Sequence, residues 1–386
     1  MIDGVLGALR EHWGNPSSVH RLGQDARAQI ELARESLANL VGARARDLVL
    51  TSGGTEAIDL AIRGVLDSRA KPGAAPPEIV SAKVEHAAVR DLVDDLETRG
   101  AARATWARVT RDGAVEIDSL RECVGPATAL VVVQWANNET GTIQPVTEIA
   151  QLCRERRVPF LCDGVQWVGK LPARLGGPAG DLGSIDCDLL AFSAHKFHGP
   201  KGVGALWVRP GMSLRPRLRG TQELGRRGGT ENVSGIVGAG VAAAEATRWL
   251  ADASERARVG SLRDLFEQRV LDRVPDAKVN GPVDAPGTPE GRLRRLWNTS
   301  NLAFPRLEAE ALLLRLSERG VCASAGAACS SGSLDPSPVL LAMGTPEADA
   351  HGSLRFSLSR DTTQAEVVRA AESVAEAVGV LRASMP

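Results

Sequence analysis

A primary amine set among small and polar residues is the first feature of the chain that points to chemistry. Lys196, in Ser193-Ala194-His195-Lys196, follows an apolar segment at 188–192 that we predict to be a buried strand. Partial burial and a neighbouring histidine favour the neutral amine that a Schiff-base lysine needs, while Ser193 and His195 can donate hydrogen bonds to an anion. These features suggest pyridoxal phosphate (PLP), although a surface lysine in a turn explains four residues equally well.

A carboxylate and an amide follow a second predicted strand at 159–162. Asp163 comes directly after this apolar strand, and burial of a carboxylate is costly unless a cation pairs with it. The protonated ring nitrogen of PLP is such a cation, and an Asx turn at the strand end is the simpler alternative. The sequence contains no tyrosine, so the phenolate oxygen of the cofactor needs another partner, for which Gln166 is the nearest candidate.

A glycine pair between a strand and a helix predicts an anion site. The expected strand at 47–51 is followed by Gly53 and Gly54, and a helix is expected to begin at Thr55. Free backbone N–H groups and the positive end of the helix dipole face an anion at such a junction, so we assign the cofactor phosphate to Gly54 and Thr55. A plain glycine turn with Thr55 as N-cap is the alternative.

Strands and helices alternate through the first 200 or so residues, which predicts an α/β fold with a mostly parallel sheet. The expected strands are 47–51, 79–84, 104–109, 129–133, 159–162 and 188–192, with a hairpin to 202–208. Ligand sites in such sheets gather at the carboxyl ends of the strands. Four distinctive groups fall at these ends, namely His86, Asn138, Asp163 and Lys196, although His86 by itself is also explained as a solvent-facing residue at a helix N-terminus.

The last third of the chain is expected to form a smaller α+β domain. An alanine-rich helical region is predicted at 232–274, followed by a proline-rich loop and by strands at 296–304 and 353–357 with helices between and after them. We therefore predict a large domain, residues 1–248, and a small C-terminal domain, residues 249–386.

Two residues of the last third have side chains suited to the same chemistry. Cys329 lies in a run of small residues that cannot anchor itself by burial, so we expect a nucleophilic thiol on a movable loop. The alternative, a small buried cysteine, fits Cys322 better. Arg355 lies on the otherwise apolar strand 353–357, where a guanidinium suggests a bidentate carboxylate clamp, and a salt bridge at the strand edge is the alternative.

The bulk composition excludes several classes of function. The formal net charge is −1 with 24% charged residues, which argues against a nucleic-acid surface or a polybasic membrane patch. Six cysteines without Cys-x-x-Cys spacing argue against a zinc site or a disulfide framework. Apolar runs stay below the ~18 residues of a membrane span and the N-terminus has no signal-peptide pattern, so we expect a cytoplasmic protein whose partners are small molecules and proteins.

These motifs occur together and in one order. They are residues 51–56, 85–86, 137–141, 163–166, 193–196 and 226–232, the Cys329 loop, and residues 355–357. With them the chain resembles, over nearly its whole length, the cysteine desulfurases of the NifS/IscS type, which are PLP enzymes of the aminotransferase class V family. The resemblance implies a PLP-dependent transferase of fold type I, with a seven-stranded, mostly parallel sheet in the large domain.

The resemblance also implies a role for each matching residue. Three would be catalytic: Lys196, which bonds to the cofactor aldehyde and moves the Cα proton, His86, which stacks on the ring, and Cys329, which accepts the sulfur. The residues implied to hold the cofactor are Gly54, Thr55, His86, Asp163, Gln166, Ser193, His195, Lys196 and, from the neighbouring subunit of a homodimer, Thr230. The residues implied to hold the substrate carboxylate are Asn138 and Arg355.

The implied reaction converts L-cysteine to L-alanine and leaves a persulfide on Cys329 for an acceptor protein, such as an iron–sulfur scaffold or a sulfur carrier. Family members begin with a strand carrying an Asp-x-x-Ala-Thr-Thr-Pro segment near the substrate pocket, and this sequence begins after it, which implies either a misassigned start or an incomplete pocket and dimer edge. Two alternatives stay open: a selenocysteine lyase, which residues 324–329 and 336–341 also resemble, and a PLP-holding scaffold for sulfur carriers without turnover.

Overall fold

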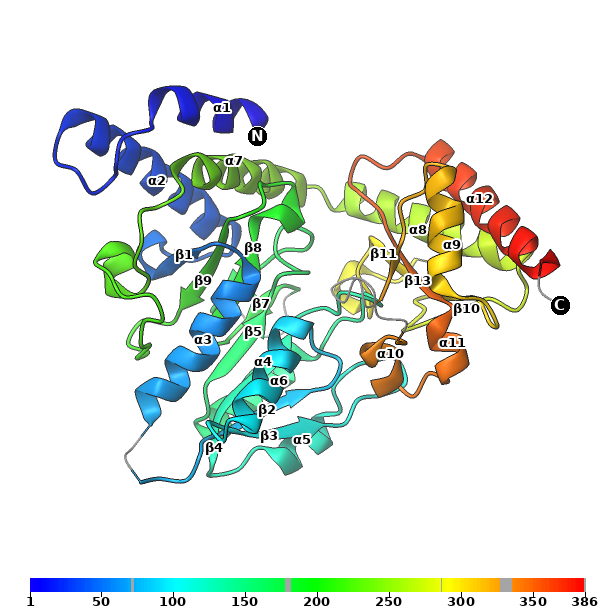
Figure 1. The fold of residues 1–386 in the computed structure, drawn as a ribbon, viewed down its shortest axis with the longest axis horizontal. Coiled ribbons are helices and arrows are strands. Elements are labelled where there is room, and N and C mark those ends of the chain that lie inside the picture. Colours follow the sequence, from blue (N-terminus) through cyan, green and yellow to red (C-terminus); the bar gives the residue numbers. More distant parts are fainter. Residues whose placement is uncertain (71–72, 178–181, 286, 327–334, 385–386) are drawn as a thin grey trace.

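The computed structural model describes residues 1–70, 73–177, 182–285, 287–326 and 335–384. Cys329, the predicted sulfur acceptor, lies outside the described residues. Within the described ranges the chain forms a large α/β unit around one sheet and a smaller α+β unit around a second sheet (Figure 1). The fold class expected from the alternation of strands and helices is therefore confirmed.

A sheet of seven described strands forms the centre of the large unit. The strands are β1 (Leu48–Thr51), β2 (Glu78–Ala82), β3 (Arg103–Ala107), β4 (Thr128–Gln134), β5 (Phe160–Asp163), β8 (Leu189–Ser193) and β9 (Gly204–Val208). Their order is β1-β9-β8-β5-β4-β2-β3, with β9 antiparallel to β1 and β8 and the remaining pairs parallel. Every residue of β4, β5 and β8 is buried, because helices cover both faces, and this explains their continuous apolar sequence.

Two hydrophobic cores lie on the two faces of this sheet. The helices of the large unit are α1 (Ile2–Glu11), α2 (Arg21–Leu40), α3 (Gly54–Arg69), α4 (Ala87–Thr98), α5 (Ile117–Cys123), α6 (Val146–Arg156) and α7 (Val233–Leu250). One core joins α3 to α4 through residues such as Ile58 and Val93, and the other joins α2, α6 and α7 through residues such as Ile30 and Ile149. Both cores hold the strand ends in place and so fix the loops that follow them.

Two expectations about the helices were wrong. Residues 2–11, for which no helix was predicted, form α1, which lies along α7, where a Cβ on Gly238 would come within 2.5 Å of Val5 Cγ2. The helical region expected over 232–274 is interrupted between α7 and α8 (Ala253–Arg273). Asp252 causes this restart, because its side chain accepts a hydrogen bond from Ser254 N over 2.8 Å and caps the second helix.

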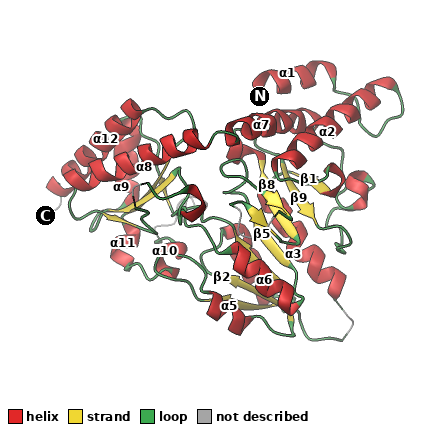
Figure 2. Ribbon diagram, turned by 180° about the vertical axis from the view of Figure 1, so that it is seen from behind, coloured by secondary structure: helices red, strands yellow, loops and turns green. Residues whose placement is uncertain are grey.

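The small unit contains a four-stranded antiparallel sheet. Its described strands, in sheet order, are β10 (Lys278–Val279), β11 (Thr299–Ala303), β13 (Ser353–Ser357) and β12 (Ser324–Ala325). Helices α8, α9 (Ala309–Glu318) and α12 (Gln364–Ala383) pack around one core, in which the rings of Phe266 and Phe356 have centroids 4.8 Å apart. Figure 2 shows both units from behind, with α7 leading from the large sheet toward the small unit.

Shorter elements complete the described fold. They are the paired strands β6 (Arg174–Leu175) and β7 (Ser184–Ile185), and the helices α10 (Pro338–Ala342) and α11 (Glu347–His351). Each helix in the described ranges is too short or too polar to span a bilayer. Cys322, expected to be a buried small residue, is exposed instead, because it lies in the turn between α9 and β12 rather than in a strand.

Candidate active site

The structure brings four predicted groups to one edge of the main sheet. His86 follows β2, Asn138 follows β4, Asp163 ends β5, and Lys196 follows β8. These four strands are consecutive and parallel in the sheet order, so their carboxyl ends open on the same side. The positive charge of Lys196 acts on the titration of both Asp163 and His86, which places the amine within electrostatic reach of the other two side chains.

Asp163 carries a buried carboxylate, on which the positive charge of Lys196 acts. Asp163 is 5% exposed. Among the described residues, its carboxylate accepts one hydrogen bond, from Val165 N to Oδ1 over 2.9 Å. Burial raises the pKa of Asp163 to about 6, against the opposing effects of the Val165 N–H and of Lys196. A protonated pyridine nitrogen would stabilise the ionised form, so this residue fits the ring of PLP.

Lys196 lies in the short 3₁₀ turn Ala194–Phe197, which is tied to the β8–β9 hairpin. Ala194 N donates to Val203 O over 3.1 Å, and Gly199 N donates to Ala194 O over 2.9 Å, so the backbone on both sides of the lysine is fixed. The side chain is half-buried. A lysine so held can present its amine at one position relative to the strand ends.

The predicted phosphate ligands surround the N-terminus of α3. Ser193 Oγ and His195 Nδ1 are 2.8 Å apart. A Cβ on Gly54 would lie 2.5 Å from Val165 Cγ2, and one on Gly53 would lie 3.8 Å from Ser193 Oγ. Glycine at these positions therefore lets the free N–H groups of the helix approach the turn after Asp163, and this cradle fits a phosphate group.

His195 and Thr230 occupy more open positions. Burial, followed by the charges of Lys196 and Lys201, lowers the pKa of His195. Thr230 is exposed, and within the described residues it makes no hydrogen bond to the other predicted phosphate ligands. Its segment is anchored by Arg227, whose Nε donates to Glu56 Oε1 over 2.8 Å at the start of α3.

His86 has a defined tautomer when neutral. It is the N-cap of α4, where Nδ1 accepts the Ala88 N–H over 3.0 Å, so the ring proton lies on Nε2. Burial, followed by the charges of Lys196 and Arg90, lowers the pKa of His86. The ring is thus neutral at pH 7, with its proton on Nε2.

Asn138 and Arg355 meet across the boundary between the two units. Arg355 Nη1 donates to the backbone oxygen of Asn138 over 2.8 Å, and Arg355 faces Asn301 across the β11–β13 pair. Asn138 Oδ1 is buried without a hydrogen-bond partner among the described residues. Buried polar atoms of this kind are normally satisfied, so a ligand is expected to complete this part of the site.

Sequence reasoning missed three buried titratable residues close to this site. Lys170 is 8% exposed and donates to Gln166 Oε1 over 2.6 Å. Glu85 is fully buried and accepts the Gln134 N–H over 2.9 Å, and Glu139 accepts a hydrogen bond from Ser337 Oγ over 2.5 Å. Their positions in the sequence were the available signal, because Glu85, Glu139 and Lys170 lie within four residues of His86, Asn138 and Gln166, respectively.

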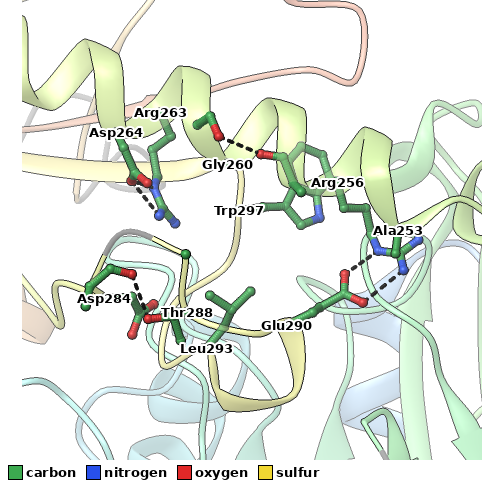
Figure 3. A pocket seen from close by; sticks show the side chains of 14 residues that line it. Ala253, Arg256, Gly260, Arg263, Asp264, Asp284, Thr288, Glu290, Leu293 and Trp297 are labelled. Carbon is green, nitrogen blue, oxygen red and sulfur yellow. Dashed lines mark hydrogen bonds and ion pairs between the residues drawn. The ribbon is translucent and has the colours of Figure 1, made fainter.

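Two cavities lie close to the boundary between the units. One, of about 150 Å³, is formed by α8 and by residues 284–285 and 287–293, with the Arg256–Glu290 ion pair at one end and Trp297 in its wall (Figure 3). None of the predicted site residues lines it. The other, of about 190 Å³, is lined by Lys170 and Lys196 and shares Trp297 with the first. The second cavity is therefore the one that belongs to the candidate site.

Comparison with known proteins agrees with this geometry. The sequence model of the aminotransferase class-V family matches residues 2–369. The chain is 42% identical to a cysteine desulfurase of a Nostoc species, covering 100% of this chain and 91% of that protein, and 44% identical to a cysteine desulfurase of Cereibacter sphaeroides, covering 100% and 94%. A solved NifS-like protein has a TM-score of 0.86 and 31% identity, covering 98% of this chain and 95% of that one.

Together, the doubly covered seven-stranded sheet and the lysine after β8 define a transferase of the fold-type-I class. By the family match and the identity to its relatives, the chain belongs to the aminotransferase class-V family and, within it, to the cysteine desulfurases.

Proposed function

We propose that this chain binds PLP and converts L-cysteine to L-alanine, passing the sulfur to Cys329 as a persulfide. The observation that carries the proposal is the convergence of Lys196, Asp163 and His86 at one sheet edge, beside the Arg355–Asn138 contact. The identity to curated cysteine desulfurases supports the choice of substrate.

The residues around this edge fit PLP, with Asp163 for the ring nitrogen, Gln166 for the phenolate oxygen and the Gly54 cradle for the phosphate. Among the described residues, the carboxylate of Asp163 accepts one hydrogen bond, from Val165 N, and the charge of Lys196 acts on it, so it can also accept from a ring nitrogen. The cradle would be filled by any Cβ at Gly54. Thr55, Ser193 and His195 supply further donors to the phosphate. When bound, PLP supplies an electron sink for the bonds at the substrate Cα.

Substrate binding falls to Asn138 and Arg355. The guanidinium of Arg355 is held by the Asn138 carbonyl, which orients it for a carboxylate. The side-chain NH₂ group of Asn138, rather than its Oδ1, is the group that can donate to the same carboxylate. A charged, planar clamp of this kind binds an amino-acid carboxylate in one orientation. It therefore directs the substrate Cα toward Lys196.

Lys196 Nζ moves the proton at the substrate Cα. Its backbone is fixed by the β8–β9 hairpin, so the amine can act at one atom. His86 carries its proton on Nε2 and is a neutral donor at the same edge of the sheet. Neither step requires a metal ion.

The sulfur step needs one nucleophile. The thiolate of Cys329 attacks the substrate sulfur, an S–S bond forms and the C–S bond breaks, and the electrons of the broken bond remain on Cβ, which takes up a proton to become the methyl group of alanine. Cysteine and one enzyme thiol thus give alanine and one enzyme persulfide, with no added oxidant. Delivery of this sulfur to an acceptor protein is part of the proposal.

We also propose that the chain acts as a homodimer in which Thr230 of one copy reaches the phosphate of the other. Thr230 is exposed, and large apolar side chains are exposed on the same unit: Trp13 is 69%, Val19 is 89% and Leu224 is 76% exposed. Exposed apolar groups in such number are typical of a protein–protein interface.

The test is an assay of the purified chain, loaded with PLP, for alanine and persulfide from L-cysteine and from L-selenocysteine. We expect alanine and protein-bound persulfide from L-cysteine in equal amounts in a single turnover. Cys329→Ala should retain the visible absorbance of the bound cofactor and lose persulfide formation, whereas Cys322→Ala, at an exposed thiol of the same region, should retain both.

Three outcomes would contradict the proposal in different ways. Persulfide in unchanged yield from Cys329→Ala would remove that residue as the acceptor. Strong rejection of cysteine in favour of selenocysteine would favour a lyase. Bound cofactor without alanine from either substrate would favour a scaffold.

A further inference from the structure

Lys170 is a second buried amine in the candidate site, and nothing in the proposed reaction uses it. It is 8% exposed, and its Nζ donates to Gln166 Oε1 over 2.6 Å. It lines the same cavity of about 190 Å³ as Lys196. A lysine is rarely buried without a reason, because burial of its charge and of its four-carbon chain carries a cost.

The backbone around Lys170 is rigid, so its amine reaches a fixed point. Trp297 Nε1 donates to Lys170 O over 2.8 Å, and Lys170 N donates to Trp167 O over 2.9 Å. Trp167 stacks on Trp135 with ring centroids 4.5 Å apart and planes 4° apart. These contacts fix the turn that contains Gln166 and Lys170 from both ends.

Gly169 brings this turn against the turn of Lys196. Its φ is +79°, and a Cβ at this position would lie 2.4 Å from the Cβ of Phe197. Phe197 directly follows Lys196 in the chain. A side chain would force the two turns apart, so glycine here sets the spacing between the Lys170 amine and the site.

The bond between Lys170 and Gln166 decides which end of the amide faces the site. A glutamine amide has one acceptor oxygen and one donor NH₂ group, and a lysine amine donates whether or not it carries its extra proton. With Oε1 held by Lys170, the NH₂ group is the one left to donate. We propose that Lys170 is a positioning residue that fixes the Gln166 amide so that its NH₂ group donates to the phenolate oxygen of PLP.

This inference rests on the proposed function, because it needs PLP beside Gln166. The described charged groups that face Lys170 are all basic: Lys196 and Arg355 act on it electrostatically, and His198 and Arg360 line the cavity with it. Burial, followed by the charges of Lys196 and Arg355, lowers the pKa of Lys170 to about 7. The protonated amine has no acceptor and so holds Oε1 strictly, whereas the neutral amine also has a lone pair, and the amide orientation is therefore fixed most firmly below pH about 7.

The consequence is a spectroscopic one. A fixed NH₂ donor stabilises negative charge on the phenolate oxygen and so lowers the proton affinity of the nitrogen that joins Lys196 to the cofactor. Loss of Lys170 should therefore raise the pKa at which the visible band of the PLP-loaded protein titrates. One hydrogen bond corresponds to a few-fold to about tenfold change in proton affinity, or up to about one pH unit.

The experiment is an absorbance titration of the PLP-loaded full chain. We expect Lys170→Met to raise the apparent pKa of the visible band, and Lys170→Gln, whose amide can still donate to Oε1, to stay close to the wild type. Adding Lys170→Met to Gln166→Leu should produce no further shift, because the amide it acts through is gone. Lys278→Met, at an exposed lysine of the small unit, is the matched control and should leave the titration unchanged.

Each contrary result has one meaning. An equal shift for Lys170→Met with and without Gln166 would show that the lysine acts by its charge alone and would overturn the positioning role, as would no shift at all. If Lys170→Met fails to fold, a wild-type titration in Lys170→Gln supports the proposal and a raised pKa in that variant overturns it. A wild type that never acquires the visible band would overturn the proposed function and this inference with it.

Discussion

Arg355 Nη1 donates a hydrogen bond to the backbone oxygen of Asn138 over 2.8 Å, although the two residues are 217 positions apart in the sequence. One lies on β13 of the small unit and the other follows β4 of the large unit. The proposed substrate-binding part of the site therefore draws on both units, and its geometry depends on how they pack together.

Replacing Arg355 by Lys should weaken substrate binding without removing the cofactor. Lysine keeps a charge but lacks the planar fork that contacts the Asn138 carbonyl and a carboxylate together, so we expect kcat/KM for L-cysteine to fall about a hundredfold, mostly through a higher KM. Steady-state kinetics with the visible absorbance recorded in parallel would check this. Arg315→Lys, at an exposed arginine of α9, should have wild-type kinetics, and the same loss in both variants would contradict the role of Arg355.

Asp163 should make the cofactor-free protein less stable as the pH rises. The pKa of this carboxyl is raised to about 6 in the fold, above the value near 3.9 of an unfolded aspartate, so its favourable contribution is present below pH ~4 and is lost as the pH rises through about 6. The difference is about 3 kcal/mol. Urea unfolding at several pH values should show this loss in the wild type and not in Asp163→Asn.

The matched control for this prediction is Asp25→Asn, at an exposed residue of α2. This variant should follow the pH dependence of the wild type. Parallel curves for the wild type and Asp163→Asn would mean that the carboxyl at 163 does not titrate with a raised pKa.

Removal of the Lys196 charge should raise the pKa of His86. Burial lowers this pKa first, and the charges of Lys196 and Arg90 lower it further, so Lys196→Ala takes away one of the causes. Two-dimensional NMR of the histidine ring nitrogens in cofactor-free protein would measure the pKa and would also show the proton of the neutral ring on Nε2.

Lys201→Ala gives the contrasting result. Lys201 contributes to the lowered pKa of His195 and is not among the groups that shift His86, so this variant should raise the pKa of His195 and leave His86 unchanged. If Lys196→Ala leaves both histidines unchanged, the amine is not close to either ring.

Glu223 should be essential to the stability of the large unit. Its carboxylate accepts from Arg34 Nη1 over 2.7 Å and Nη2 over 2.8 Å, and from Leu50 N over 2.7 Å, and both side chains are buried. Glu223→Ala leaves the guanidinium buried without this partner, so we expect a loss of about 3–5 kcal/mol in the free energy of unfolding.

A double variant separates the charge from the packing. Arg34→Met combined with Glu223→Leu removes both charges and should recover much of the lost stability in urea unfolding. Glu31 is a partly exposed partner of Arg34 on the same helix. Glu31→Gln should therefore lower the free energy of unfolding by less than about 1 kcal/mol. A cost for Glu223→Ala as small as that of Glu31→Gln would rule out a stabilising role for the buried pair.

The chain order of the motifs was enough to place most of the candidate site. His86, Asp163 and Lys196 each follow an apolar strand, and parallel strands open their carboxyl ends on one side of a sheet, so local sequence fixes their common edge. The same local signals located α4 and β13 without error, because a histidine cap and a short β-prone run act over a few residues.

Other features were decided by packing at long range. Nothing local shows that residues 2–11 lie along α7 or that Cys322 is exposed, whereas the interruption at Asp252 has a local signal, the N-cap hydrogen bond from Ser254 N. The Lys170–Gln166 bond depends on a turn held by Trp297 from a distant segment, and the Arg355–Asn138 bond depends on the approach of two units. The sequence by itself determined the strand ends and their chemistry, whereas only the tertiary structure decided which buried groups share a hydrogen bond, because such a bond requires two segments to meet within about 3 Å.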